Sequence, residues 1–382
     1  MKVGIVVPFS WSYWGGVNEH ADQQARTLME LGHEARIVIG NDPPGRLTRM
    51  LHPRQGSHEP PPPYVIPVGR SVIVPANGTL PNIVLSPPAM GRMRRIWARE
   101  GFDVVHVHEP MAPLISAFAL ATAPCPIVTT SHASGSRWIV PADVLWGRVL
   151  KERIDHRIAV SEQALRAAEP ALGRPIEIIP NGVRIPPAAD PGNRSGNVVF
   201  VGRHDPRKGL EHLLRAWPRV TARMGSRLRV IGADPLSVSF LMRRKGLSGG
   251  AIDVLGSVSE ERLTEELFAA SVLVAPSIGR ESFGMVLTRA FACATPVVCS
   301  DIEGYRDVAG PETSVLVPPA DPEALAEAVI GLLEDEPRRR ALGEAARAVA
   351  AERYSWKTIA ARLVEIYGQV SGVRAVARAA AR

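Results

Sequence analysis

Two successive series of short apolar segments constrain the fold of this 382-residue chain more than any other feature. The first series begins at residues 2–8, and the pattern restarts at residues 198–202 after a polar loop at 190–197. Helical periods lie between the segments, many of which are rich in Val and Ile. Short runs that are apolar throughout are typical of strands buried on both faces of a parallel sheet. The sequence therefore predicts an α/β protein with two Rossmann-like domains in tandem.

The positions of the segments set the expected domain boundaries. Strands are expected at residues 2–8, 34–40, 103–108, 126–131, 156–161 and 176–180, and then at 198–202, 228–232, 252–256, 272–276, 296–300 and 314–318. Helices are expected at residues 17–31, 209–223, 259–270, 282–293 and 322–333. We expect a first domain over residues 1–180, a second over 181–355, and a C-terminal helix over 356–382 that crosses back to the first domain. An interdomain cleft would then lie at the carboxyl edges of the two sheets, where open α/β sheets bind ligands.

The composition excludes several classes of protein. The three cysteines form no CxxC pair, which suits a reducing cytoplasm. No run of 18 apolar residues exists, and no signal-peptide pattern precedes the first strand, so we expect neither a membrane-spanning nor a secreted chain. The net charge of +7 leaves three classes of partner: nucleic acid, an anionic membrane surface, or a small anionic substrate.

Part of this charge lies next to one uncharged segment. Residues 71–90 carry no charge and contain four prolines, and four arginines without an acid follow, with apolar residues between them. The arginines are Arg92, Arg94, Arg95 and Arg99, and the apolar residues include Met93, Ile96 and Trp97. This pattern is typical of a helix that binds a membrane interface. A buried loop beside a solvated helix face explains it equally well.

The first strand leads into a glycine-containing turn, Gly15-Gly16-Val17, at the start of a helix. Glycines there allow a ligand to approach the backbone, and a helix N-terminus favours anions. A double glycine alone is more often a plain turn. The sequence lacks GxGxxG at this point and contains no GxxxxGK[ST], which argues against a dinucleotide oxidoreductase and a P-loop nucleotidase.

The second series opens with a basic turn between its first strand and first helix. In this turn Arg203 and Lys208 lie five positions apart, between Gly202 and Gly209. Two cations placed in this way can reach one diphosphate from two sides. A solvated basic loop is the alternative interpretation.

A carboxylate follows the strand expected at residues 272–276. Glu281 and Ser282 lie between Gly279 and Gly284, close to the start of a helix. Both side chains could cap that helix. Alternatively, Glu281 binds sugar hydroxyl groups while the backbone N–H groups hold a phosphate, and the two roles can coexist.

Three histidines fall at the ends of neighbouring expected strands. His132 ends one strand, and His106 and His108 share one face of another, with Glu109 beside them. The His106/His108 spacing would suit metal ligands. Because no further Cys, His or Asp cluster matches it, we favour hydrogen-bonded core histidines over a zinc site.

Taken in order, these motifs resemble the family 4 retaining glycosyltransferases of the GT-B fold. Among them the chain is most similar to the actinobacterial phosphatidylinositol mannosyltransferases that use GDP-mannose. The resemblance covers nearly the whole chain. Besides the motifs above, it includes Pro8, Pro110, residues 158–161 (IAVS) and residues 180–183 (PNGV).

The resemblance implies roles for individual residues. Arg203 and Lys208 would bind the donor diphosphate and stabilise the departing nucleoside diphosphate, and Glu281 would contact the transferred hexose. His132 would lie beside the anomeric centre, which completes the implied catalytic set of His132, Arg203, Lys208 and Glu281. The implied donor-binding residues are Gly16, Arg203, Lys208, Val258, Glu281, Ser282, Phe283, Gly284, Met285 and Arg289. The implied acceptor-binding residues are Asn18, Asn77, Thr79 and Arg137, and the implied membrane contacts are Arg92, Arg94, Arg95 and Arg99.

Two further implications concern cofactors and the nucleotide. Such enzymes need no obligatory bound metal, and here Arg203 and Lys208 would supply the positive charge, so Mg²⁺ would be optional. The family usually carries a ribose-binding glutamate where this chain has Arg289, which leaves the identity of the nucleotide open.

The leading hypothesis is a retaining hexosyltransferase. It would move mannose from GDP-mannose to a phosphatidylinositol-type lipid, as a peripheral protein on the cytoplasmic face of the cell membrane. Its partners would be the nucleotide sugar, the anionic lipid acceptor and the membrane surface, and its oligomeric state stays open. One alternative is a family 4 enzyme with another nucleotide sugar and a soluble polar or sugar-phosphate acceptor. A basic nucleic-acid-binding protein is a remote alternative, because no helix-turn-helix, zinc pattern or aromatic-interleaved basic strand occurs.

Overall fold

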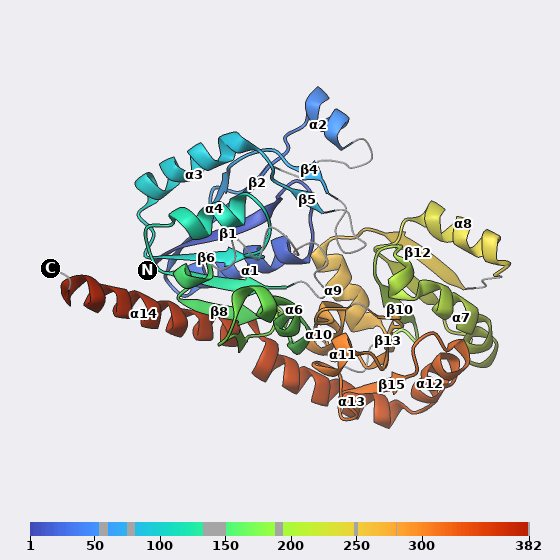
Figure 1. The fold of residues 1–382 in the computed structure, drawn as a ribbon. Helices are drawn as coiled ribbons and strands as arrows, with labels where there is room; N and C mark the ends of the chain where they lie inside the picture. Colours follow the sequence, from blue (N-terminus) through green and yellow to red (C-terminus); the bar gives the residue numbers. More distant parts are fainter. Residues whose placement is uncertain are drawn as a thin grey trace. The chain divides into compact units, whose positions relative to one another are not determined.

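The computed structural model describes residues 1–52, 60–74, 81–132, 150–187, 194–247, 251–279 and 281–380, with side chains up to residue 372. The chain forms two compact units (Figure 1). Unit 1 consists of Met1–Gly182 with Trp356–Arg382, and unit 2 consists of Val183–Ser355. The C-terminal segment from Trp356 therefore belongs to the first unit.

Unit 1 is built on a parallel sheet with the strand order β3-β2-β1-β6-β7-β8-β9. The strands are β1 (Lys2–Ser10), β2 (Glu34–Gly40), β3 (Val65–Pro67), β6 (Val104–His108), β7 (Ile127–Ser131), β8 (His156–Ala159) and β9 (Glu177–Ile178). Two short strands, β4 (Val72–Ile73) and β5 (Asn82–Ile83), pair antiparallel, and β5 also pairs with the end of β1. The strand order changes direction between β1 and β6, which marks the switch point where open α/β sheets bind ligands.

Helices cover both faces of this sheet because its central strands are apolar on both sides. Val3, Ile5 and Val7 of β1 belong to one core cluster and Val6 belongs to the other, as the period of two in a strand requires. The helices are α1 (Gly16–Glu30), α2 (Arg46–Leu51), α3 (Pro87–Glu100), α4 (Ile115–Thr122), the short 3₁₀ turn η1 (Lys151–Arg153), α6 (Glu162–Leu172) and α14 (Trp356–Ala380). Residues of α1 and α14 pack in the first cluster, and residues of α3, α4 and α6 pack in the second.

The long helix α14 packs on unit 1 through an apolar stripe. Its buried apolar residues follow an i, i+3, i+4, i+7 pattern: Trp356, Ile359, Ala360, Leu363, Ile366, Tyr367 and Val370. This spacing places them on one face of the helix, which lies against α1. Gly182 fits closely beneath Trp356, since a Cβ atom there would come within 2.4 Å of the indole ring.

Unit 2 has a six-stranded parallel sheet with the order β12-β11-β10-β13-β14-β15. Its strands are β10 (Val198–Val201), β11 (Leu228–Ile231), β12 (Ile252–Gly256), β13 (Val272–Ala275), β14 (Val297–Ser300) and β15 (Ser314–Val317). Numbered within the unit, this order is 3-2-1-4-5-6, the dinucleotide-fold order with its switch point between the first and fourth strands. The carboxyl ends of β10 and β13 therefore meet where a ligand is expected.

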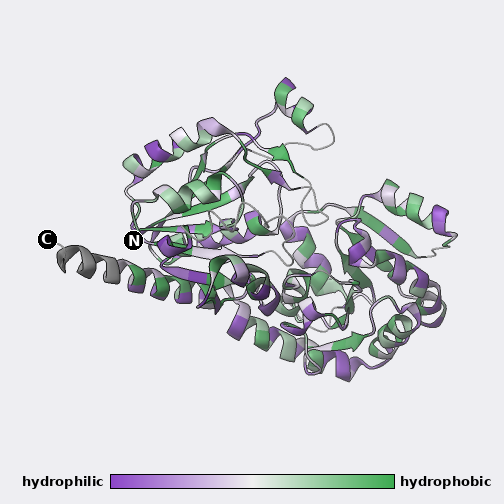
Figure 2. Cartoon of the chain, in the orientation of Figure 1, coloured by the Kyte–Doolittle hydropathy of each residue, from purple (hydrophilic) through white to green (hydrophobic). Residues whose placement is uncertain are grey.

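The connecting helices of unit 2 are largely amphipathic, with polar and apolar bands alternating along the ribbons (Figure 2). They are η2 (Pro206–Lys208), α7 (Leu210–Met224), α8 (Pro235–Lys245), α9 (Glu260–Ala269), α10 (Met285–Ala292), α11 (Glu303–Arg306), α12 (Pro322–Glu334), α13 (Glu336–Val349) and the π-helical turn η3 (Ala350–Tyr354). Trp217 of α7 is almost fully buried in their common core.

The predicted α/β fold with two parallel sheets is confirmed. Several expected ends differ from the observed ones by one or two residues, and one helix start is wrong by three. The helix expected from residue 282 begins at Met285, and its N-cap is Gly284 in a left-handed conformation (φ +84°). Neither Glu281 nor Ser282 caps it, which frees Glu281 for another contact.

Candidate active site

The carboxyl ends of β10 and β13 bring a lysine and a glutamate together. Lys208 lies at the end of the short helix η2, after β10, and Glu281 lies in the loop between β13 and α10. The Lys208 Nζ atom is 2.8 Å from Glu281 Oε1, and the two side chains are 31% and 13% exposed. The contact unites the two strongest sequence motifs of unit 2 at the switch point of its sheet.

Buried hydroxyl groups hold the Glu281 carboxylate in place. Ser277 donates a hydrogen bond to Glu281 Oε1 (3.0 Å), and the Tyr305 hydroxyl lies 2.8 Å from Ser277 Oγ. Burial, and then the charge of Glu281, raise the pKa of Tyr305 well above its usual value. The phenol therefore stays protonated and can donate to Ser277, which orients the carboxylate.

Two glycines let the loops of this site approach each other. Gly209 adopts φ +69°, and a Cβ atom there would come within 1.8 Å of the Pro276 carbonyl oxygen. At Gly304, a Cβ atom would come within 1.8 Å of the Glu281 carbonyl oxygen. A side chain at either position would displace the backbone next to Lys208 or Glu281.

Four other candidate donor-binding residues differ in exposure and in contacts. Arg203 is exposed after β10. Phe283 is buried against the Tyr354 ring, with the ring centroids 5.7 Å apart, so its contribution to a ligand would come from its backbone. Arg289 on α10 forms an ion pair with Glu260 (3.0 Å), the first residue of α9. Val258 lies in the loop before that helix and is partly buried.

In unit 1, Asn18 braces the loop between β1 and α1. Its side-chain amide donates to the carbonyl oxygens of Ser10 (2.8 Å) and Tyr13 (3.2 Å), and its exposed fraction is 1%. The Asn18 Oδ1 atom has no hydrogen-bond partner among the described residues. Gly16 opens α1 beside it, so the turn predicted from Gly15-Gly16 leads directly into the helix.

A cluster of four buried histidines lies at the switch point of unit 1. His106 and His108 on β6 stack with their ring centroids 4.7 Å apart, and His108 Nδ1 is 2.9 Å from His132 Nε2. His20 of α1 packs edge-on against His108 and His132. The backbone N–H of His132 donates to Glu109 Oε1 (2.9 Å), and Glu109 itself adopts a left-handed backbone conformation (φ 49°).

Burial controls the charge of these imidazoles. It lowers the pKa of His20 to about 4 and that of His106 to about 3, and it lowers the pKa values of His108 and His132 well below their usual range. All four rings are therefore neutral at physiological pH.

Within the part of the chain that the structure describes, this cluster also contains the residues best placed to hold a metal ion. One nitrogen atom from each of His20, His108 and His132 lies within 4.8 Å of the others. Both ring nitrogens of His106 and of His108 already have hydrogen-bond partners, as expected for core histidines.

Two family models match the chain. A "Glycosyltransferase Family 4" model matches residues 14–185, and a "Glycosyl transferases group 1" model matches residues 195–335. A phosphatidyl-myo-inositol mannosyltransferase of Mycolicibacterium smegmatis is 36% identical over 97% of this chain and 95% of its own length. The chain belongs to glycosyltransferase family 4. A relative of the same name from Mycobacterium leprae is 35% identical over 97% of both chains.

Solved structures agree on the fold of this glycosyltransferase. A sucrose-phosphate synthase from Thermosynechococcus elongatus matches with a TM-score of 0.72 and 22% identity, covering 97% of this chain and 99% of the other. A glycosyltransferase from Rickettsia africae matches with a TM-score of 0.71 and 18% identity, covering 97% and 98%. The predicted GT-B fold and glycosyltransferase activity are therefore confirmed.

The arginine-rich helix of the glycosyltransferase differs from the membrane-binding pattern in one respect. Met93, Ile96 and Trp97 of α3 are buried in the core of unit 1, and the Trp97 indole donates to Thr122 Oγ1 (3.1 Å). The hypothesis of an apolar helix face available to a membrane is therefore wrong for these three residues. The four arginines are exposed. None of the described helices is both long and apolar enough to cross a bilayer.

The remaining predicted acceptor residues, Asn77, Thr79 and Arg137, lie outside the described residues. The sequence analysis missed Gln24 and Tyr367, which contact the histidine cluster, and Ser277 and Tyr305, which orient Glu281. Gln24 carried a usable signal, because it lies between Ala21, Ala25 and Leu28 on the buried face of α1.

Proposed function

We propose that this glycosyltransferase transfers mannose from GDP-mannose to a phosphatidylinositol lipid, with retention of configuration, at the cytoplasmic face of the membrane. The observation that carries the proposal is the Lys208–Glu281 pair at the switch point of unit 2, in a chain similar over its whole length to phosphatidyl-myo-inositol mannosyltransferases. A further relative is named as a GDP-mannose-dependent mannosyltransferase and is 28% identical over 63% of this chain.

Glycosyl transfer develops two charges that the site must stabilise. Positive charge develops on the sugar ring and negative charge on the departing diphosphate. Lys208 and the exposed Arg203 supply cations to the diphosphate, so the donor needs no obligatory metal ion. Glu281, oriented by Ser277, accepts hydrogen bonds from hydroxyl groups of the mannose. Residues 282–285 bring backbone N–H groups to the donor at the start of α10.

Unit 1 supplies the acceptor side of the reaction. His132 lies beside the anomeric carbon, and Asn18 contacts the polar head group together with Asn77, Thr79 and Arg137. The exposed arginines of α3 attract an anionic membrane surface, where each basic residue contributes about 1 kcal/mol. Because the apolar residues of α3 are buried, this attraction is electrostatic and should weaken at high salt.

The test is transfer of labelled mannose from GDP-mannose to phosphatidylinositol, with and without a chelator. Lys208→Ala should lower kcat about 100-fold or more, because it removes a preorganised charge from the leaving group. Lys245→Ala is a matched control, since Lys245 is also 31% exposed and pairs with a glutamate, Glu211, at 3.1 Å. Equal activities of the two variants would refute the site, and loss of activity on chelation would refute the metal-independent mechanism.

Burial of the apolar face of α3 also favours a second candidate, transfer to a soluble acceptor. Co-sedimentation with anionic vesicles distinguishes the two. Under the lipid proposal, replacing Arg92, Arg94 and Arg95 by Gln abolishes binding. Replacing the basic cluster at the end of α8, residues 243–245, removes the same charge from unit 2 and should leave binding intact. Failure of the unmodified protein to bind would favour the soluble acceptor.

A further inference from the structure

A continuous chain of buried hydrogen bonds connects α14 with His132. The Gln24 side-chain nitrogen is 2.8 Å from the Tyr367 hydroxyl, and the Gln24 side-chain oxygen is 2.9 Å from His108 Nε2. His108 Nδ1 is in turn 2.9 Å from His132 Nε2. Gln24, His108 and Tyr367 are fully buried, and His132 is 9% exposed.

Further hydrogen bonds, made by His106, hold the Tyr367 end of this series of hydrogen bonds. His106 Nδ1 lies 2.6 Å from the Tyr367 hydroxyl and 3.0 Å from the Gln24 nitrogen. His106 Nε2 lies 2.7 Å from Thr130 Oγ1. The Gln24 amide therefore has the Tyr367 hydroxyl and His106 on its nitrogen side and His108 on its oxygen side.

The order of donors and acceptors along the chain then follows. The Gln24 oxygen can only accept, so His108 Nε2 carries the proton and donates to it. In a neutral ring His108 Nδ1 is then an acceptor, which requires His132 Nε2 to carry a proton. His132 Nδ1 is left with a lone pair. Rotating the Gln24 amide by half a turn would reverse each of these assignments and convert both rings to the other tautomer.

We propose that Gln24 is a positioning residue that holds His132, through His108, as the Nε2–H tautomer. The inference rests on the proposed function, which places His132 beside the reacting sugar. With this tautomer, His132 Nδ1 accepts a hydrogen bond from a hydroxyl group of a bound substrate. The opposite tautomer would present an N–H group at the same place, which could donate to the hydroxyl oxygen but could not accept the hydroxyl proton.

The test measures tautomers directly, by the ¹⁵N shifts of the imidazole nitrogens in histidine-labelled protein, with the His132 signals assigned from a His132→Asn variant. The unmodified protein should show His132 as the Nε2–H tautomer. In Gln24→Leu it should become a mixture, and kcat should fall about tenfold, the effect of one misplaced hydrogen bond on a barrier, with KM for the donor unchanged. Gln24→Glu keeps an acceptor towards His108 and should restore both signals and kcat.

A matched control comes from the same helix. Thr27 of α1 is buried but takes no part in the chain, so Thr27→Val should leave tautomer and kcat unchanged. Three results would overturn the proposal: an Nδ1–H tautomer in the unmodified protein, an unchanged His132 in Gln24→Leu, or binding of Co²⁺ by His20, His108 and His132. Because the spectra need no substrate, they test the tautomer even if the proposed donor or acceptor is wrong.

Discussion

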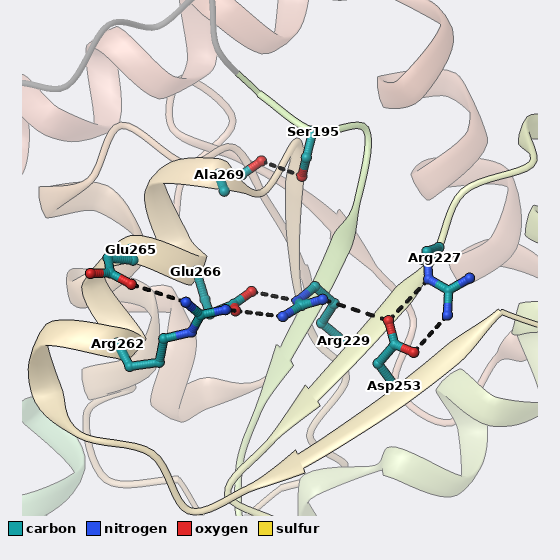
Figure 3. Close-up of polar contacts among 8 residues, drawn as sticks. All are labelled: Ser195, Arg227, Arg229, Asp253, Arg262, Glu265, Glu266 and Ala269. Carbon is teal, nitrogen blue, oxygen red and sulfur yellow. Dashed lines mark hydrogen bonds and ion pairs between the residues drawn. The ribbon is translucent and has the colours of Figure 1, made fainter.

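Glu266 lies near the surface of unit 2, and replacing it should lower the free energy of unfolding of that unit more than most surface substitutions would. Its carboxylate is only 5% exposed and lies between two guanidinium groups (Figure 3). Arg229 donates to it through two nitrogens (2.5 and 2.6 Å), and Arg262 donates through a third (2.6 Å). Glu266→Gln would remove the charge that both arginines share while preserving the shape of the side chain.

The structure limits how much the free energy of unfolding of unit 2 should fall. Removing one partner of a buried ion pair destabilises a protein by about 3–5 kcal/mol. Arg229 is 20% exposed and keeps a second carboxylate, Asp253, at 3.6 Å, and the glutamine still offers one acceptor. We therefore expect the free energy of unfolding of unit 2 to fall by about 2–3 kcal/mol. This loss corresponds to a decrease in Tm of about 5–10 °C for a unit of this size.

The neighbouring residue provides the matched control. Glu265 pairs with Arg262 (3.1 Å), but the side chains are 66% and 53% exposed, so Glu265→Gln should cost less than about 0.5 kcal/mol. Urea unfolding, with hydrogen exchange of β11 as the probe specific to unit 2, measures both variants. If Glu266→Gln were no more destabilising than Glu265→Gln, the argument from burial would be refuted.

Two further predictions concern protonation and packing. Burial lowers the pKa of His20 to about 4 and that of His106 to about 3, against about 6.5 when unfolded, so the unfolded state binds more protons. Unit 1 therefore loses stability as pH falls from about 6.5 to about 4 through His20, and to about 3 through His106. At pH 5 the loss should be about 2 kcal/mol per histidine, and urea midpoints that match at pH 7 and pH 5 would contradict it. Gly304→Ala should abolish transfer, because its Cβ atom would displace the Glu281 backbone. Gly331→Ala is the control: a Cβ atom there has nothing within 4 Å, so the variant should stabilise α12 by about 0.5–1 kcal/mol. Activity assays and thermal unfolding measure both variants, and an active Gly304→Ala enzyme would contradict the prediction.

The fold was predictable because the composition of its strands differs from that of the flanking segments. The buried strands read as continuous apolar runs, and a parallel arrangement requires the helices between them. The short elements that depend on tertiary contacts were not predictable in this way. The strands β3, β4 and β5 have two or three residues each, too few for a periodic pattern. The start of α10 was missed because Gly284, rather than a polar side chain, ends the preceding loop.

The candidate site was predictable where a charged residue closely follows an expected strand. Lys208 and Glu281 each follow an apolar run, so their convergence in unit 2 could be anticipated from the strand pattern alone. Gln24 and Tyr367 could not be assigned in the same way, since their partners lie 82 and 261 positions away in the sequence. A polar residue on an otherwise apolar helix face shows that a partner is required, but it does not show which one.

The two units use different electrostatic means at equivalent places in their sheets. In unit 2 the Lys208–Glu281 pair is partly exposed, so both charges keep part of their solvation. In unit 1 the histidine cluster is buried so deeply that a charged imidazole would be costly, and only neutral forms persist. A neutral ring cannot direct a ligand by its net charge, but the nitrogen that carries the proton determines whether the ring donates or accepts. The buried amide of Gln24 can therefore determine whether His132 donates or accepts, at a place in unit 1 where an unpaired buried charge would be too costly.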